Sequence, residues 1–500
     1  MKKKRTNPLK SSTKTIDATN SYLYLPDECW ESVFRFLIND DDNQQYLKSL
    51  SVVSKQLLSI ANSFKSSLTV HNPTRPLLHH LLQRFANITS LDLSCYKGDV
   101  NKLIHQISRL PMKVTSLNLS NQPNVPTDGL HAFSQKITTL TSLTCSNIHS
   151  IDSTDLFLIA HCFPLLEELD LGHPGEFGNY KSLLDAIKAL SLALSKLRKV
   201  NLSRHCYLND QSIHHLFKNC KVLEEAILFE CYGISNDGVA FALRERPKLW
   251  ALSFSNTTVG SARIETKVTS DFCVSLASLK CLTCLDLSSL SISNDLLSSI
   301  ALEGLPLRRL VLQNCYGYTY LGIFCLLFKC RSIQHLDLQK AEFLIDHEVV
   351  GMSLFLGDLV SINLSECRML TNSALFALVK NCPSLSDIKM EHTSIGINSE
   401  ENSNSLTDLI SNPQLKSLYL ARNSWLRDES LIMFASIFPN LQLLDLSDCD
   451  FISEEVICQV LRRCCKIRHL SLVECNVVKL LGLNFEISKV GGVELDIHKG

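Results

Sequence analysis

The sequence has no long apolar run and no excess of charge of either sign. Its longest apolar stretches fall far short of the roughly 20 residues that span a bilayer. The 49 Lys and Arg residues balance 50 Asp and Glu residues. Because binding phosphate needs a net or local basic excess, this total gives no indication of nucleic acid or a membrane surface as a partner.

The first residues also lack the apolar core of a signal peptide. Only a short basic run, Lys2 to Arg5, precedes a polar segment, which is either a nuclear import patch or a solvated tail. We therefore expect a protein of the cytoplasm or the nucleus. Residues 1–20 are rich in Lys, Ser and Thr, and we expect them to be disordered.

Motifs of catalysis and cofactor binding are missing. There is no Gly-rich phosphate loop, no H-E-x-x-H and no G-x-S-x-G, so we predict neither an enzyme nor a cofactor. Cys281-Leu282-Thr283-Cys284 has the form of half a zinc site, but no second pair completes it. We predict no metal site and, for the 20 cysteines of so long a chain, free thiols.

What the sequence does contain is a repeat. Leu441 to Cys449 reads L-x-x-L-x-L-x-x-C, and so do Leu359 to Cys367 and Ile467 to Cys475. We call the middle apolar residue of each copy its centre residue. Fifteen copies follow one another, most of them 26 residues apart, and Leu495 and Ile497 suggest a weaker last copy. The centre residues are Leu91, Leu117, Leu143, Leu169, Val200, Ala226, Leu252, Leu285, Leu310, Leu336, Ile362, Ile388, Leu418, Leu444 and Leu470.

Each copy predicts one strand and one helix. In L-x-L the side chains alternate, so both leucines point to the core. About ten residues later comes an amphipathic stretch such as 373–380, preceded by the capping residues Thr371 and Asn372. Because one such unit cannot bury its apolar faces alone, stacked copies form one parallel sheet. We predict an α/β solenoid shaped as a horseshoe, with the sheet on its concave face and the helices outside.

The cysteines recur at fixed positions relative to the centre residues, and this spacing indicates which class of repeat the chain resembles. Five lie five residues after a centre residue, and four lie six residues before one, where tight turns need a small buried residue. The pattern resembles the cysteine-containing class of leucine-rich repeats over residues 85–500, with a C-terminal cap. The nine cysteines are Cys231, Cys315, Cys367, Cys449, Cys475, Cys220, Cys330, Cys382 and Cys464.

No repeat is visible before Leu91, where three short helices are predicted instead. The first begins at Leu25-Pro26-Asp27-Glu28, with Pro26 at its first position, and carries an apolar stripe. A polar loop, 40–45, and two further apolar groups follow. Three helices in about 45 residues make a marginal core, so this segment either caps the repeats or buries its stripe on a partner.

This segment, 21–68, resembles an F-box: L-P-x-E, an apolar stripe, then Leu50-Ser51-Val52-Val53-Ser54-Lys55-Gln56-Leu57. Residues 69–84 would be a junction. Together with the repeats, the chain resembles plant-type F-box and leucine-rich-repeat proteins, which are substrate receptors of SCF ubiquitin ligases. The resemblance implies docking onto a Skp-type adaptor, and through it a cullin. It implies the contacts Leu25, Pro26, Val33, Phe34, Leu37, Val53 and Lys55.

The target protein is not named by the sequence, but the concave face offers candidate contacts. Asp and Ser recur between the core leucines, and apolar exceptions stand out as candidate anchors. They are Ile227, Phe229, Val311 and Tyr419, with Trp425 just beyond its strand. Three long spacings add residues within 172–182, 256–270 and 394–405, and inserted loops often lie on a binding face.

Two other functions stay open. A repeat scaffold or inhibitor would bind a protein without ubiquitin transfer. A small-molecule hormone co-receptor holding a polyphosphate would need converging basic groups. Arg309, Lys340, Lys389 and Arg422 are the candidates, but acidic residues are interleaved. An immune sensor would need a nucleotide-binding domain, for which residues 1–84 have no room.

Overall fold

The computed structural model describes residues 25–38, 44–177, 180–256, 267–397, 412–475 and 494–496. The chain divides into two compact units. The N-terminal unit comprises residues 1–98 with 111–114, and the repeat unit comprises residues 99–110 with 115–500. No helix among the described residues is both long enough and apolar enough to cross a membrane.

The N-terminal unit begins with three short helices, α1 (Asp27–Ile38), α2 (Gln44–Ser51) and α3 (Lys55–Ser63). The carbonyl of Pro26 accepts hydrogen bonds from the amides of Cys29 (3.1 Å) and Trp30 (3.2 Å). Pro26 therefore precedes the first helical residue and lies one position earlier than predicted. Ser54 caps α3 by accepting a hydrogen bond from the Leu57 amide at 3.1 Å, which satisfies a free donor of the first turn.

A small core joins α1 to α3. Phe34, Leu57 and Ile60 are buried, and Trp30, Leu50, Ala61 and Phe64 pack around them. The rings of Phe34 and Phe64 stack with their centroids 5.9 Å apart. Among the described residues of these helices few side chains are buried, and the other flank of α1 is exposed at Val33 and Phe36.

The repeats begin one copy earlier than the sequence analysis placed them. Strand β1 (Ser67–Thr69) pairs in parallel with β2 (Ser90–Asp92), and Leu68 lies opposite Leu91. The 3-10 helix η2 (Asn72–Leu77) and helix α4 (Leu78–Arg84) connect the two strands. The interval from Leu68 to Leu91 is 23 residues, shorter than the common 26. This shorter interval hid the copy.

In the repeat unit, the register of the strands confirms the predicted centre residues. From Leu117 to Leu470 each centre residue lies opposite that of the next copy, and Leu470 lies opposite Leu495. Two short strands, β5 (Ser150–Ile151) and β7 (Glu176–Phe177), form a separate pair. The strands of the long sheet are β3 (Ser116–Asn118), β4 (Ser142–Thr144), β6 (Glu168–Asp170), β8 (Lys199–Asn201), β9 (Glu225–Leu228), β10 (Ala251–Phe254), β11 (Cys284–Asp286), β12 (Arg309–Val311), β13 (His335–Asp337), β14 (Ser361–Asn363), β15 (Asp387–Lys389), β16 (Ser417–Tyr419), β17 (Leu443–Asp445), β18 (His469–Ser471) and β19 (Glu494–Asp496).

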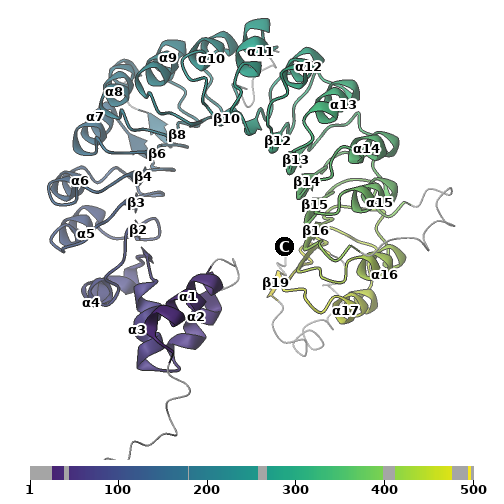
Figure 1. Cartoon of the computed structure of the whole chain (residues 1–500), viewed down its shortest axis with the longest axis horizontal. Helices are drawn as coiled ribbons and strands as arrows, with labels where there is room; N and C mark the ends of the chain where they lie inside the picture. Colours follow the sequence, from purple (N-terminus) through teal and green to yellow (C-terminus); the bar gives the residue numbers. More distant parts are fainter. Residues whose placement is uncertain are drawn as a thin grey trace, which may run out of the picture. The chain divides into compact units, whose positions relative to one another are not determined.

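Helices alternate with these strands. Within the repeat unit, the strands line the inner side of the stack and the helices its outer side (Figure 1). Leucines of both layers meet between them and are buried. The helices are α5 (Val100–Ile107), α6 (Thr127–Ser134), α7 (Ser153–Cys162), α8 (Tyr180–Ala193), α9 (Asp210–Asn219), α10 (Asn236–Leu243), α11 (Ser270–Ala277), α12 (Asn294–Glu303), α13 (Tyr320–Lys329), α14 (Asp346–Ser353), α15 (Asn372–Asn381), α16 (Asp428–Ile437) and α17 (Glu454–Arg463). The fold is a leucine-rich-repeat solenoid of the α/β class, as predicted.

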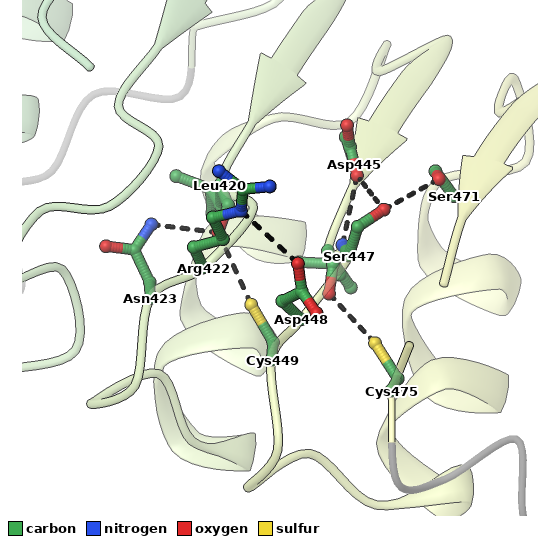
Figure 2. A network of polar contacts seen from close by, with 10 residues as sticks. Leu420, Arg422, Asn423, Asp445, Ser447, Asp448, Cys449, Ser471 and Cys475 are labelled. Atoms are coloured by element: carbon green, nitrogen blue, oxygen red, sulfur yellow. Dashed lines mark hydrogen bonds and ion pairs between the residues drawn. The ribbon is translucent and has the colours of Figure 1, made fainter. Parts of the chain in front are cut away.

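In many copies a polar residue follows the centre residue and ends the strand. Figure 2 shows Asp445, whose carboxylate accepts hydrogen bonds from the Ser447 amide at 3.0 Å and the Ser447 hydroxyl at 2.6 Å. The recurrence of Asp and Ser at these positions by itself predicts solvated side chains. They instead build a turn in which the side chain bonds the backbone two residues on. The same amide contact occurs at Asp92, Asn118, Asp170, Asn201, Asp286, Asp337 and Asn363.

The fourth residue after the centre residue adopts a left-handed backbone. Asp448 has φ 56°, although left-handed φ is unfavourable for residues with a Cβ. Thirteen copies show this geometry without glycine. The other twelve residues are Asn121, Asn147, His173, Arg204, Glu230, Ser289, Asn314, Lys340, Glu366, His392, Arg422 and Glu474.

In several copies the side chain of the fifth residue after the centre residue bonds the preceding copy. The Cys449 thiol donates to the Leu420 carbonyl at 3.3 Å, and the Cys475 thiol donates to that of Leu446 at 3.0 Å (Figure 2). Asn423 and His205 occupy the same position and contact the carbonyls of Met390 and Leu171. All 20 cysteines are free thiols, as predicted.

Candidate protein-binding surfaces

Large apolar side chains are exposed on the helices of the N-terminal unit. Phe36 is 81% exposed and Val52 is 83% exposed, and Leu25, Val33 and Val53 are exposed as well. We call these five residues the N-terminal apolar surface. Exposed apolar side chains gathered on so short a segment are typical of a surface that binds another protein.

Helix α1 separates core residues from surface residues. Trp30 and Phe34, four residues apart, face α3 and its core. Val33 and Phe36 lie on the other flank and are exposed, because a step of three residues on a helix keeps the same side. Gln56 on α3 donates to the Leu25 carbonyl at 3.3 Å and to Asp27 Oδ1 at 2.6 Å. These contacts hold the start of α1 beside the start of α3, so Leu25 lies near the turn that carries Val52 and Val53.

The structure corrects one of the adaptor contacts expected from the resemblance. Phe34 is 0% exposed because it forms the core with Leu57 and Ile60, so the expectation of a surface contact at Phe34 is wrong. Phe36 and Val52 are exposed and were missed. The spacing of Cys29, Val33 and Phe36, which marks a second stripe on α1, was the available signal.

The remaining expected contacts were Leu25, Pro26, Val33, Val53 and Lys55, which are all exposed, and Leu37. The side chain of Leu37 lies outside the described residues. Adaptor binding by these residues stays a prediction.

On the inner sheet face, Ile227 borders an acidic recess of about 220 Å³. Lys199 of β8 lies between two carboxylates of neighbouring strands, with its Nζ 3.2 Å from Glu168 and 3.8 Å from Glu225. Asp170 also lines the recess. Ile227 and Phe229 are half-buried, so each presents part of an apolar side chain to the sheet face.

A second recess, of about 160 Å³, lies over strands β12 to β15. Arg309, His335, Asp337, Asp387 and Lys389 line it. Val311 lies in its floor and is only 5% exposed. Its neighbours in register are Asp286 and Asp337. The expectation of an exposed apolar anchor is therefore wrong at Val311.

Charges on this part of the sheet face are partly desolvated. Burial, followed by the nearby Arg309, lowers the pKa of His335, and His335 Nδ1 lies 2.8 Å from the Ser361 hydroxyl. Burial raises the pKa of Asp286 and of Glu391. Groups whose charged forms are disfavoured in this way suit hydrogen bonding to a polar chain better than strong binding of a single ion.

The four basic residues considered for a polyphosphate do not converge. Arg309 and Lys389 line the same recess, but Lys340 lines a different one. Arg422 is paired with Asp448 at 3.3 Å. The Lys389 ammonium lies 4.8 Å from the centre of the Tyr419 ring, where the negative face of the ring attracts it.

Tyr419 is half-buried and Trp425, in the turn after β16, is 52% exposed. Trp425 is therefore the most accessible of the expected target contacts. The inserted segments 257–266 and 398–411 lie outside the described residues. Among the residues that are described, no group of three or more His, Cys, Asp or Glu is placed to hold a metal ion.

No protein-family model matches the sequence, and no curated protein matches it. Many solved structures are similar in fold, and three serve as examples. A chain of the yeast Rad7 and Elc1 complex is 14% identical, with 94% of this chain and 97% of that chain covered and a TM-score of 0.48. An internalin (inlF) from Listeria monocytogenes is 15% identical, with 81% and 95% covered and a TM-score of 0.36. A chain of the mouse RP105/MD-1 complex is 16% identical, with 86% and 78% covered and a TM-score of 0.45. At these values the likeness supports no functional assignment.

Proposed function

We propose that this chain is the substrate-recognition subunit of an SCF-type ubiquitin ligase, acting in the cytoplasm or the nucleus. In this proposal α1 to α3 bind a Skp-type adaptor, and the repeats hold a target protein. The observation that carries the proposal is the N-terminal apolar surface, which lies within the segment that resembles an F-box. Its side chains are exposed, so a partner that covers them would gain the free energy of apolar burial.

No residue of the chain needs to catalyse a reaction in this role. A receptor that binds both the adaptor and a target converts a bimolecular encounter into a local one and so raises the effective concentration of the target. The solenoid suits the second task, because its sheet presents rigidly spaced side chains. Trp425, Tyr419, Ile227 and Phe229 are the proposed target contacts.

The test is capture of purified Skp-type adaptor by the full chain and by a Val52→Glu/Val53→Glu variant. Both valines are exposed, so the substitutions leave the core of the unit intact. We expect the wild type to capture the adaptor and the variant to lose at least about tenfold in affinity, because two charges would be buried against an apolar partner.

A matched control carries the same charges on an exposed part of the repeat unit. Val274 on α11 and Leu354 after α14 are exposed apolar residues, and the Val274→Glu/Leu354→Glu variant should bind adaptor like the wild type. Circular dichroism would verify that all three proteins are folded. If the folded wild type captures no adaptor, the ligase role is wrong and a repeat scaffold or inhibitor without ubiquitin transfer takes its place.

A further inference from the structure

One edge of the repeat unit concentrates positive charge. The segments that link each helix to the next strand, in six consecutive copies, contain eleven Lys and Arg residues and three Glu residues, a net charge of +8. The whole chain has a net charge of −1. We call these segments the basic edge: 192–198, 218–224, 244–250, 277–283, 302–308 and 328–334. The equivalent segments on either side, which contain Glu167 and Asp358, carry no Lys or Arg.

The six segments lie side by side. The amide of Glu224 donates to the carbonyl of Arg198 at 2.8 Å, and the amide of Trp250 donates to Glu224 at 2.9 Å. The chain of contacts continues through Thr283, Arg308 and Gln334 at 2.8–2.9 Å. The cations of successive copies are therefore neighbours along one continuous edge, where like charges raise the local potential together.

Most of these cations are not neutralised. Three are paired with carboxylates: Arg198 with Glu224, Arg244 with Asp271, and Lys280 with Glu303. Five other exposed cations form no ion pair within the part of the chain that the structure describes. These are Lys196, Lys218, Lys221, Lys248 and Arg308.

A recess of about 420 Å³ opens in the basic edge between two copies. Lys221, Arg246 and Lys248 line it. The Arg246 guanidinium donates to the carbonyls of Lys221 (3.0 Å) and Lys218 (3.3 Å), so it caps the end of α9. The ammonium groups of Lys221 and Lys248 have no such bonds among the described residues, which leaves them available for an anion.

Apolar side chains are interspersed with these cations. Leu302 is 82% exposed, and Leu192, Val222 and Phe328 are exposed too. Three of the four are aliphatic. Aliphatic side chains on a basic surface fit the apolar residues of a polypeptide, whereas single-stranded nucleic acid is bound by basic grooves with aromatic stacking platforms.

We propose that the basic edge binds an acidic polypeptide segment that carries apolar side chains between its carboxylates. Its carboxylates would pair with Lys221, Lys248 and their neighbours, and its apolar residues would cover Leu302 and Val222. An anionic membrane fits less well, because Glu224, Glu245 and Glu303 lie on the same edge and would face the lipid charges. This proposal does not depend on adaptor binding by α1 to α3.

The test measures binding of a fluorescent peptide rich in Glu and Leu to the full chain by polarisation, at low and high salt. We expect binding that weakens with salt. A Lys221→Glu/Lys248→Glu variant should lose about tenfold or more in affinity, because two attractive charges become repulsive. A Leu302→Ser variant should lose about threefold with the salt dependence unchanged, because it removes apolar contact alone.

The matched control is Lys380→Glu/Lys416→Glu, which makes the same charge change at exposed lysines in equivalent segments of copies outside the basic edge. It should stay within about twofold of the wild type. Equal losses in both double variants would overturn the proposal, and so would the absence of peptide binding by the folded wild type. Tighter binding to a single-stranded oligonucleotide, or to phosphatidylserine vesicles, with the same sensitivity to Lys221 and Lys248 would assign the edge to that ligand instead.

Discussion

At the scale of single residues, the stack imposes a backbone geometry that its side chains do not favour. Thirteen non-glycine residues take left-handed φ at the same position of the repeat. Each costs about 1–2 kcal/mol relative to the right-handed form. Most of these residues donate their own backbone amide to a carbonyl of the next copy, as the Lys340 amide does to Ser365 at 2.8 Å. The hydrogen bonds between copies therefore outweigh a local cost that recurs along the sheet.

Relieving this cost at one residue should stabilise the protein. Lys340 has φ 65° and an exposed side chain. We expect Lys340→Gly to raise the unfolding free energy by up to about 1 kcal/mol, because glycine accepts this φ while its unfolded state gains some entropy. Urea unfolding followed by circular dichroism measures the change. As control, Lys380→Gly at an exposed position in the last turn of helix α15 should lower the unfolding free energy by up to about 1 kcal/mol. A loss of stability at both positions would show that the strain at Lys340 is negligible.

Orientation of single side chains was the least predictable feature of the site. The sequence places Val33, Phe34 and Phe36 within one turn of helix, and only the packing of α1 against α3 decides that Phe34 is buried and Phe36 is not. Val311 was expected to be exposed because it interrupts a polar row. Its burial follows from neighbours on two other strands, which no local pattern of β12 contains.

At the scale of elements, three different residue types fill the same position in the turns after the strands and make the same kind of contact. Cys449, Asn423 and His205 each contact a carbonyl of a preceding copy. The shared requirement is a buried donor that satisfies an otherwise unpaired carbonyl. Only His205 among the three titrates below neutral pH, and burial lowers its pKa to about 4.

His205 should therefore make stability depend on pH. The unfolded state binds a proton near pH 6.5 and the folded state only near pH 4, so the unfolded state holds more protons between these values. Stability is then fully present above pH 6.5 and is lost as pH falls, with a slope of up to about 1.4 kcal/mol per pH unit. A His205→Asn variant keeps a donor and should have a flatter profile between pH 4 and 6.5, measured by urea unfolding. Superimposable profiles would contradict this role of His205.

The regular interval between copies made the strands predictable. At the first copy, where the interval is shorter, a strand was missed. An interval near 26 residues places each centre residue opposite the next, which is the observed register. The first copy, at Leu68, was missed because its interval is 23 residues and its strand offers only Leu68 and Val70. The role of the Asp after each centre residue was also missed, although its recurrence at Asp92, Asp286 and Asp445 was visible.

At the scale of the whole molecule, the repeat buries more than half of the thiols and so keeps them from reacting. Eleven of the 20 cysteines are buried, five are half-buried and four are exposed. Burial raises the pKa of Cys231, Cys367 and Cys449 to about 12. Because the thiolate is the reactive form, these groups are inert in the folded protein.

Thiol titration reads out this protection directly. With Ellman's reagent at pH 8 we expect rapid reaction of the four exposed cysteines, Cys29, Cys95, Cys281 and Cys465. The half-buried thiols should react more slowly, and all 20 should react in guanidinium. Rapid reaction of more than nine thiols, the sum of the exposed and half-buried groups, in the native protein would mean that the stack opens readily. A total below 20 in guanidinium under non-reducing conditions would reveal disulfides.

The left-handed turn position carries Asn, His, Arg, Glu, Ser, Lys and Asp in different copies. Neither core packing nor turn chemistry selects among these types. Successive copies therefore display a row of side chains at fixed intervals, and some neighbours in the row are paired, as Arg204 is with Glu230 and Arg422 is with Asp448. Substitutions can therefore change the charge of this row one neighbouring pair at a time, without altering the buried core beneath it.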